Sequence, residues 1–438
     1  MNTPLVSLRA TALLLCLGSL PALAPAQNVK PPKAQLWMDV STGSMPGMPE
    51  MDMPGVGSLL GGMMGGGGGQ DLYGMARGMN ISPPRVLDIA LYNRLKPGVE
   101  AAQSIPLGMR MGERLPLLPF VPQAVRESEP TDVPPDYQRE TPKGRILIYW
   151  GCGATVRPGQ PRVIDLASGN PAQFAAAFAG RYAPDRGARV GPGYALFPNE
   201  KNRQSLPRDA SLVGEHRVLG DGVPPSMKFT LGAAQDLLPA FDLQLAGGLA
   251  DSVNVGWRPM AQARAYYLHA MGQAGENDMV MWSSAETPDT GMGMFDFLSQ
   301  GTIERWLKDK VLLPPETVQC EVPKGIFSPK AGAGGDGGGA MLRIIAYGNE
   351  SNFAHPPRPA DPKAVWEPDW SLRVRVKSHA LAMLGEESSG GRSGRAGSNS
   401  TNSAPTAGAP AQGQPSSAAD ALNPLANPAN LLKGLFGR

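Results

Sequence analysis

Short stretches of alternating apolar and polar residues, broken by Pro-Pro pairs, restrict most strongly how this chain can fold. Apolar side chains occupy every second position in residues 227–231, 241–245 and 253–257, the pattern of a strand with one buried face. Proline cannot donate a hydrogen bond within a sheet, so the Pro-Pro pairs belong between strands. They stand at Pro83-Pro84, Pro134-Pro135, Pro224-Pro225, Pro314-Pro315 and Pro356-Pro357. The pattern predicts a mainly β chain and favours β-sandwiches over α/β folds.

Individual stretches differ in their expected burial. Residues 372–377 alternate so that one face is dry and the other, with Arg373, Arg375 and Lys377, is wet. Residues 146–150 are apolar on both faces, which indicates a central strand. Helical periodicity is scarce and predicts only two short helices, over residues 170–180 and 302–310.

The first residues have the pattern of an export signal. Arg9 precedes an apolar run over residues 10–17, and an Ala-x-Ala motif ends at Ala26. The run is too short for a membrane anchor, which needs about 20 apolar residues. We expect a signal peptide over residues 1–26 and an exported protein of the periplasm or cell envelope, or one secreted further. No transmembrane span is expected in the mature chain.

Glycine-rich and small-residue segments divide the remainder. Residues 41–79, 331–339 and 386–438 bury too little apolar surface to offset the entropy of ordering them, and are expected to be flexible. The expected fold is two β-sandwich-like domains with a flexible Gly/Met-rich N-terminal segment and a disordered Ser/Gly/Ala/Pro-rich C-terminal tail. The predicted parts are residues 27–84 (Met/Gly-rich segment), 85–225 (first β-rich domain), 226–380 (second domain) and 381–438 (tail).

Two cysteines remain after removal of the predicted signal. In an oxidising compartment Cys152 and Cys320 can form a disulfide across a long loop. The alternative is two separately buried thiols, because the sequence does not place their Cα atoms close together.

The stretch DSVNVGWRPMAQARAYYLHAM carries Trp257 and Pro259 as Trp-x-Pro, followed by Ala263 and Tyr266 as Ala-x-x-Tyr. It resembles the B and C strands of a fibronectin type III-like or immunoglobulin-like β-sandwich. Residues 279–284 then match the next strand, 341–351 strand F and 371–378 strand G. The resemblance covers about residues 226–380 and implies a sandwich with an inserted helix and a Gly-rich loop. Such domains serve adhesion, spacing and binding, so it leaves the activity open.

Motifs for catalysis are missing from the sequence. The four histidines have no zinc-site spacing, and there is no HExxH, CxxC or GxSxG motif. The run GAGGDGGGA lacks the Lys-Ser/Thr of a phosphate-binding loop. A net charge of +2 gives no electrostatic reason to expect nucleic acid.

A cluster of methionines indicates a specific chemistry more clearly than the histidines or the glycine runs do. Met45, Met48, Met51 and Met53 form MxxMxxMxM, and thioethers are soft ligands that suit Cu(I) or Ag(I). Exported methionine clusters of this kind resemble those of periplasmic copper-handling proteins. The alternative is a low-complexity linker or an apolar gap-filling segment.

Trp366 and Trp370, in VWEPDW, are the tryptophans expected to be exposed and to form a ligand platform. Glu367 and Asp369 beside them suit a cation or sugar hydroxyls. The alternative is that both rings serve in core or loop packing.

These patterns favour an exported cell-envelope protein that acts in binding or scaffolding. They favour a non-enzymatic role over an enzymatic one. The expected partners are other envelope proteins or surface polymers. The alternatives are a periplasmic Cu(I)/Ag(I)-binding protein that uses the Met-rich segment, and a secreted hydrolase with a site built from loops.

Overall fold

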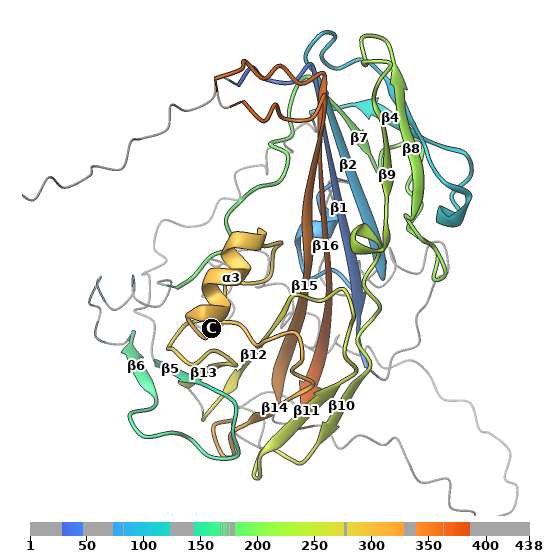
Figure 1. The fold of residues 1–438 in the computed structure, drawn as a ribbon. Helices are drawn as coiled ribbons and strands as arrows, with labels where there is room; N and C mark the ends of the chain where they lie inside the picture. Colours follow the sequence, from blue (N-terminus) through green and yellow to red (C-terminus); the bar gives the residue numbers. More distant parts are fainter. Residues whose placement is uncertain are drawn as a thin grey trace, which may run out of the picture.

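The structure is a computed structural model. It describes residues 29–46, 73–81, 83–122, 144–166, 180–275, 278–327, 339–361 and 363–385, with four single residues between 168 and 175. In this part the chain is mainly β, as the alternation predicted. Most of its strands belong to one large sheet, and three form a smaller sheet (Figure 1). No helix among the described residues is long and apolar enough to cross a membrane.

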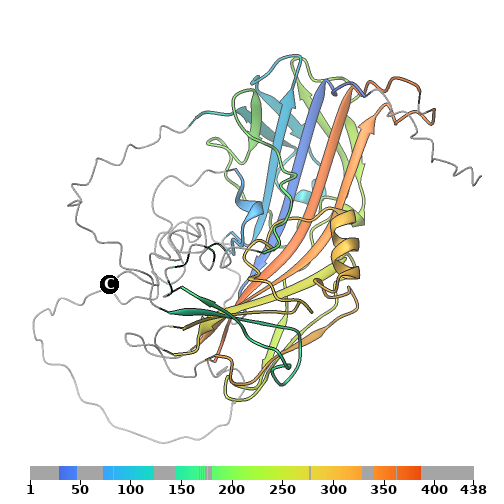
Figure 2. The same cartoon turned by 90° about the vertical axis from the view of Figure 1, so that its left-hand side faces the viewer.

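Thirteen of the described strands pair edge to edge in the large sheet. From one end to the other they are β6 (Arg162–Asp165), β5 (Arg145–Trp150), β13 (Asp278–Ser283), β12 (Ala265–Gln273), β15 (Ala340–His355), β16 (Trp370–Leu384), β1 (Ala34–Ser44), β2 (Arg85–Asn93), β7 (Tyr194–Phe197), β4 (Arg114–Pro119), β3 (Ala101–Ser104), β8 (Gly214–Gly220) and β9 (Lys228–Leu231). The small sheet is β10 (Leu243–Ala246), β11 (Val253–Trp257) and β14 (Gln319–Val322). The long strands β15, β16, β1 and β2 run through the middle of the molecule (Figure 2).

Strand β1 lies where a flexible segment was expected. It pairs in parallel with β16 and antiparallel with β2, so it is a central strand of the large sheet. Leu36, Met38 and Val40 supply its buried apolar face. The prediction of flexibility over residues 27–84 is therefore wrong for residues 34–44. It is also wrong for residues 75–77, which form a turn of 3-10 helix with Ala76 buried. The signal was present as an alternation of three apolar residues, but polar Asp39 and Ser41 on the other face concealed it.

The main core lies on one face of the large sheet. The small sheet covers part of this face, and the rings of Trp257 and Tyr266 meet across the two sheets with centroids 5.3 Å apart. The far end of the large sheet also folds over it. Phe229 of β9 packs on Trp370 of β16, with ring centroids 6.2 Å apart. The core is thus enclosed between layers of strands, which explains why the alternating stretches keep one apolar face.

Helix α3 (Gln300–Lys308) corresponds to the helix predicted over residues 302–310 and begins two residues earlier. Ser299 caps it by accepting a hydrogen bond from the Thr302 amide, and Ile303 and Trp306 form its buried side. Three single turns of 3-10 helix complete the described elements: η1 (Met75–Arg77), η2 (Leu107–Met109) and η3 (Ala233–Gln235). The helix predicted over 170–180 lies largely outside the described residues, although Ala172 and Ala175 are helical.

Strands from both predicted domains share the large sheet. The hairpin β8–β9 spans the predicted boundary at residue 225, and β5 from the first range pairs with β13 from the second. The strand pairing thus gives no support for a division at residue 225, which stays a prediction. The predicted disordered tail over residues 381–438 begins too early, because residues 381–384 are the end of β16, where Leu381, Ala382 and Leu384 are buried. The predicted signal peptide, residues 331–338 of the Gly-rich loop and residues 386–438 lie outside the described residues.

Candidate functional site

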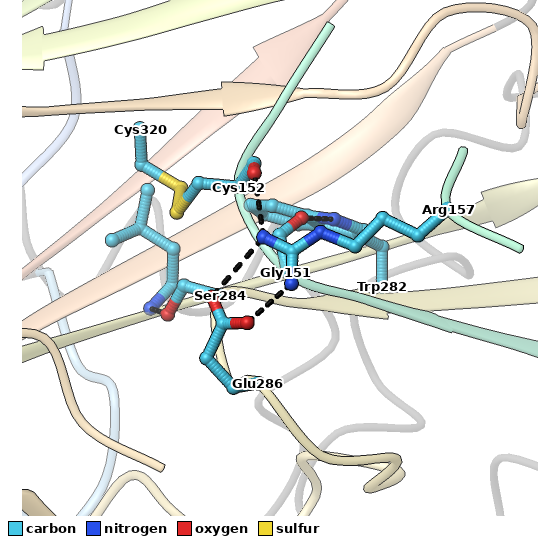
Figure 3. The surroundings of a disulfide bond; sticks show 8 residues. Gly151, Cys152, Arg157, Trp282, Ser284, Glu286 and Cys320 are labelled. Carbon is cyan, nitrogen blue, oxygen red and sulfur yellow. Dashed lines mark hydrogen bonds and ion pairs between the residues drawn. A yellow bond between two sulfur atoms is a disulfide. The ribbon is translucent and has the colours of Figure 1, made fainter. Parts of the chain in front are cut away.

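A disulfide ties the small sheet to the large one. Cys152, just after β5, is bonded to Cys320 of β14, with Cα atoms 5.2 Å apart (Figure 3). Around it, Trp282 Nε1 donates to the Gly151 carbonyl at 3.0 Å, and Arg157 pairs with Glu286 and donates to the Cys152 carbonyl. Of the two alternatives left open by the sequence, the structure has the paired cysteines.

The second face of the large sheet carries buried charges. Arg375, Asp39 and Asp88 stand directly opposite one another on the neighbouring strands β16, β1 and β2. Each is only 1 % exposed. The expectation of a wet face over residues 372–377 is therefore wrong for Arg375 and Lys377. The expectation failed because residues 73–81 and 289–298 lie over this face. These two segments are here called the cover. Alternation within one strand does not reveal that other segments of the chain will bury its polar side chains.

Arg375 and Asp39 form the central ion pair of this face. Arg375 donates from Nε to Oδ1 of Asp39 at 2.7 Å and from Nη2 to Oδ2 at 2.5 Å. This two-point geometry satisfies both carboxylate oxygens, which a buried ion pair needs if its attraction is to offset its desolvation. The guanidinium also lies over the ring of Phe297 in the cover, 4.5 Å from its centre.

Asp88 is the unusual carboxyl of the group. Its Oδ2 accepts the Ala76 amide of η1 at 2.8 Å. Burial raises the pKa of Asp88 to about 7, the Ala76 amide lowers it, and the neighbouring charge of Asp39 raises it again. The sequence held a signal for this residue, because Asp88 interrupts the apolar strand VLDIALY. Asp39 and Asp88 were both missed as candidates.

Lys377 fixes the cover to the sheet. Its ammonium group donates to the carbonyls of Gly78 at 2.8 Å, Arg77 at 3.0 Å and Phe295 at 3.1 Å. Burial lowers the pKa of Lys377 to about 8. Three carbonyls from two separate segments converge on one buried cation, so this contact holds the cover in place.

Three of the four histidines are buried and share one arrangement. In His216, His269 and His379, Nε2 lies 2.8 Å from a backbone carbonyl, of Leu212, Thr290 and Asn80 respectively. A carbonyl only accepts, so Nε2 carries the proton and Nδ1 is the acceptor. Burial lowers the pKa of each, that of His379 to about 3. These histidines are neutral hydrogen-bonding parts of the core, in keeping with a structural role.

Arg343 differs from the other buried cations. Its Nη2 donates to Nδ1 of His269 at 2.9 Å, and its guanidinium lies 4.2 Å from the ring centre of Phe295. Burial lowers the pKa of Arg343 to about 10. The buried face therefore mixes ion pairs, neutral histidines and cation–aromatic contacts.

The predicted tryptophan platform meets an open groove of about 700 Å³. Trp366 and Trp370 both line it, together with Trp37, Phe229 and Phe353. Trp370 is only 4 % exposed and donates from Nε1 to the Ser226 carbonyl, so the expectation that it is an exposed ring is wrong. Packing against Phe229 from the folded-over end of the sheet buries it. Trp366 is half-buried and donates to the Pro356 carbonyl.

Glu367 and Asp369, expected to suit a cation or sugar hydroxyls, are each paired with a lysine. Glu367 pairs with Lys30 at 2.9 Å and Asp369 with Lys33 at 2.7 Å. These lysines come from the segment just before β1, so both carboxylates help to attach that segment to the loop before β16.

The predicted thioether site lies mostly outside the described residues. Met45 follows β1 and is half-buried, while Met48, Met51 and Met53 are not among the residues that the structure describes. The Cu(I) or Ag(I) site at these positions stays a prediction.

Within the part of the chain described, the arrangement thus offers a structural ionic layer, an aromatic groove and a disulfide between sheets. Comparisons of the chain with family models, with curated proteins and with solved structures found no match.

Proposed function

We propose that this chain is an exported binding or scaffolding protein of the cell envelope, and that it holds an extended, acidic segment of a partner protein in the aromatic groove. The observation that carries the proposal is the composition of the groove. Five aromatic side chains and the cations Lys228, Arg358 and Arg373 line it, whereas none of its described lining residues is acidic. Aromatic and arginine side chains are the ones that contribute most at protein interfaces.

Strand edges on the groove support an extended ligand. Residues 350–355 of β15 pair only with β16 among the described strands, because the pairing of β12 with β15 ends at Tyr347. Strand β9 is the last strand of the sheet and pairs only with β8 in the same part of the chain. Both edges contribute lining residues to the groove. An unpaired strand edge can accept the backbone of an added strand.

The fold proposed for residues 226–380 is consistent with such a role. We propose a fibronectin type III-like sandwich, in which β11 and β12 correspond to the predicted B and C strands and β15 and β16 to F and G. Supporting this, β11 lies in the small sheet while β12, β15 and β16 are neighbours in the large one. Strands B and C of the immunoglobulin-like sandwich are likewise divided between its two sheets.

Site-specific photocrosslinking of the full chain in the envelope of a producing cell tests the proposal. A photoreactive residue at position 366 is expected to give a crosslinked partner, and the same residue at Val318, 40 % exposed away from the groove, is expected to give none. The bound segment of that partner should be acidic.

Charge reversal provides the control within the groove. Arg358→Glu is expected to abolish the crosslink from position 366. Arg258→Glu, at an exposed arginine directly after β11 of the small sheet, should leave it intact. Equal crosslinking from positions 366 and 318, or a crosslink unaffected by Arg358→Glu, contradicts the proposal.

A further inference from the structure

The two strand edges that line the aromatic groove approach each other at one end. Gln235, shortly after β9, donates from Nε2 to the hydroxyl oxygen of Ser351 on β15 at 2.9 Å. Asn349 of β15 donates to the carbonyl of Ala234 at 3.0 Å. Beyond these contacts, residues 352–355 of β15 and residues 228–230 of β9 line the groove. The space between these two stretches is here called the slot, and it is closed at the Ser351 end.

The ring of Trp370 contacts both sides of the slot and limits its width. The centre of this ring lies 6.0 Å from that of His355 on β15 and 6.2 Å from that of Phe229 on β9. The rings of His355 and Phe229 are therefore at most about 12 Å apart. One strand placed between two others needs two strand spacings, about 10 Å in total. The slot thus suits a single added strand and is too narrow for a pair of strands.

One set of side chains in the slot belongs to the core face of the sheet. Phe353 stands opposite the buried Leu372 and packs against the main core. Phe229 of β9 is 6 % exposed and belongs to the same core. Both aromatic side chains line the groove, so an inward-pointing side chain of an added strand would meet apolar neighbours on either side.

The other set belongs to the outer face of the sheet and is cationic. Lys228 and Asn352 alternate with Phe229 and Phe353 along their strands, so they point outward, and both are exposed. Arg373 stands opposite Asn352 and donates from Nε to its Oδ1 at 3.0 Å. All three residues line the groove. An outward-pointing side chain of an added strand would therefore lie between Lys228 and Arg373.

Two acidic residues near the slot are already paired. Glu350 accepts hydrogen bonds from Nε and Nη2 of Arg186, so its charge is compensated beside the closed end of the slot. Glu215 pairs with Lys228 at 2.7 Å, but both side chains are more than half exposed, and such a pair contributes little. The outer face of the slot thus keeps a preference for acidic side chains.

We infer that the partner segment enters the slot as an added strand of about four residues, in which apolar side chains alternate with acidic ones. Its backbone pairs with the edges of β15 and β9. Its apolar side chains point toward Phe353 and Phe229, and its acidic side chains point toward Lys228 and Arg373. The inference rests on the function proposed above and specifies the sequence pattern and the backbone pairing of the ligand.

Lining from both faces of the sheet favours this mode over side-chain docking on a surface. A hollow on one face of a sheet is lined by alternate residues of each strand, because successive side chains point to opposite faces. The slot is lined by successive residues of both strands, which is what a gap between two strand edges produces. In strand addition the main-chain hydrogen bonds supply affinity, and the alternate side chains supply specificity.

Binding of short peptides to the full chain tests the alternation. The first peptide is Val-Asp-Val-Glu-Val, acetylated and amidated at its ends and carrying a fluorescent label on a flexible linker. The second has the same residues in the order Val-Val-Val-Asp-Glu. Because charge and composition are equal, general electrostatic attraction does not distinguish the two. Fluorescence anisotropy is expected to show that the second peptide binds about tenfold more weakly.

Two further measurements report on the backbone of the added strand. N-methylation of the central valine of the first peptide removes one main-chain donor and keeps every side chain, and it should weaken binding about tenfold. Hydrogen exchange should slow in residues 228–231 and 352–355 when the first peptide is bound. It should stay unchanged in β11 and β14 of the small sheet.

A substitution in the chain tests the outer face of the slot. Lys228→Gln removes one positive charge and should weaken binding of the first peptide about threefold without altering the circular dichroism spectrum. Lys201→Gln, at a lysine that is 66 % exposed and does not line the groove, is the matched control and should leave binding unchanged.

Several outcomes overturn the added strand. Equal binding of the two peptides, unchanged binding of the methylated peptide, or failure of every peptide to bind does so. Slow exchange of both edges in the free chain would mean that another part of this chain, or a second copy, already fills the slot, and it also overturns the inference. The proposed function fails separately, if the crosslink from position 366 is absent or its bound segment is not acidic.

Discussion

Asp88 lowers the stability of the folded chain as the pH rises from the ordinary carboxyl pKa to neutrality. The carboxyl has a raised pKa, about 7, in the folded protein, because burial disfavours its charged form. Between the ordinary carboxyl pKa and pH 7, Asp88 therefore keeps its proton in the folded state and loses it in the unfolded state. By linkage, the stability contributed by this group is complete at low pH and is lost as pH rises toward 7.

Asp88→Asn should remove this dependence. Relative to the wild type, the variant is expected to gain about 1.3 kcal/mol of unfolding free energy between pH 5 and 6 and about 1 kcal/mol between pH 6 and 7. The comparison comes from urea unfolding at pH 5, 6 and 7. Asp209→Asn, on a largely exposed side chain, is the matched control and should show no such trend. A constant difference between Asp88→Asn and wild type would contradict the raised pKa.

His379 acts in the opposite direction. Its pKa is lowered to about 3 by burial and by the charge of Lys377, so the unfolded chain binds a proton below pH 6.5 while the folded chain does not. Stability from this group is therefore lost as pH falls below 6.5. His379→Gln keeps a donor for the Asn80 carbonyl. Between pH 6 and 4, the variant should lose about 1.4 kcal/mol less unfolding free energy per pH unit than the wild type. The unfolding free energy of both proteins, measured between pH 6 and 4, checks this prediction. The same dependence on pH in both proteins would contradict it.

Among the elements, the strands were the most predictable part and the covered face the least. The stretches at 146–150, 253–257 and 372–376 lie in β5, β11 and β16, because an alternating face leaves its period in the sequence whatever it packs against. The same reasoning wrongly predicts that Arg375 and Lys377 are exposed. A single strand does not record that two distant segments will cover its polar face, so burial of that face emerges only from the tertiary arrangement.

The candidate sites divide in the same way. The sequence around Trp366 and Trp370 predicts two exposed rings in a loop. Trp370 is instead buried by Phe229, which lies 141 residues earlier in the chain, so the local sequence does not reveal its burial. The predicted thioether site at Met45, Met48, Met51 and Met53 rests on sequence proximity alone, because its spacing is visible without a fold.

Lys377 gives a prediction at the level of elements. Lys377→Met removes three charge-assisted hydrogen bonds and leaves the carbonyls of Arg77, Gly78 and Phe295 without this donor. A loss of about 2–4 kcal/mol is expected. Hydrogen exchange should accelerate in residues 74–79 and 293–297, while β12 and β15 keep their protection. Lys324→Met, on an exposed lysine, should change neither. Uniform acceleration throughout the sheet would mean that Lys377 does not act on the cover specifically.

At the scale of the whole molecule, the disulfide joins parts that the chain separates widely. Cys152 and Cys320 are 168 residues apart. In the chain-entropy model a crosslink over a loop of this length stabilises the folded state by about 5 kcal/mol. Replacing both cysteines by Ser is expected to lower the unfolding free energy by up to that amount. Reductant should destabilise the wild type and leave the double variant unaffected. Equal denaturant midpoints for wild type and variant would contradict a crosslink of this importance.

The parallel pairing of β1 with β16 has a consequence for the order of events during synthesis. Asp39 and Arg375, which meet at the centre of the large sheet, are 336 residues apart. A newly made chain carries β1 long before its partner emerges, and during that interval one edge of β1 remains without its native neighbour. Completion of the middle of the sheet must wait for almost the entire described chain, which is typical of slow folding dominated by non-local contacts. Pairing of β1 with β16 is therefore among the last steps that synthesis of the described chain permits.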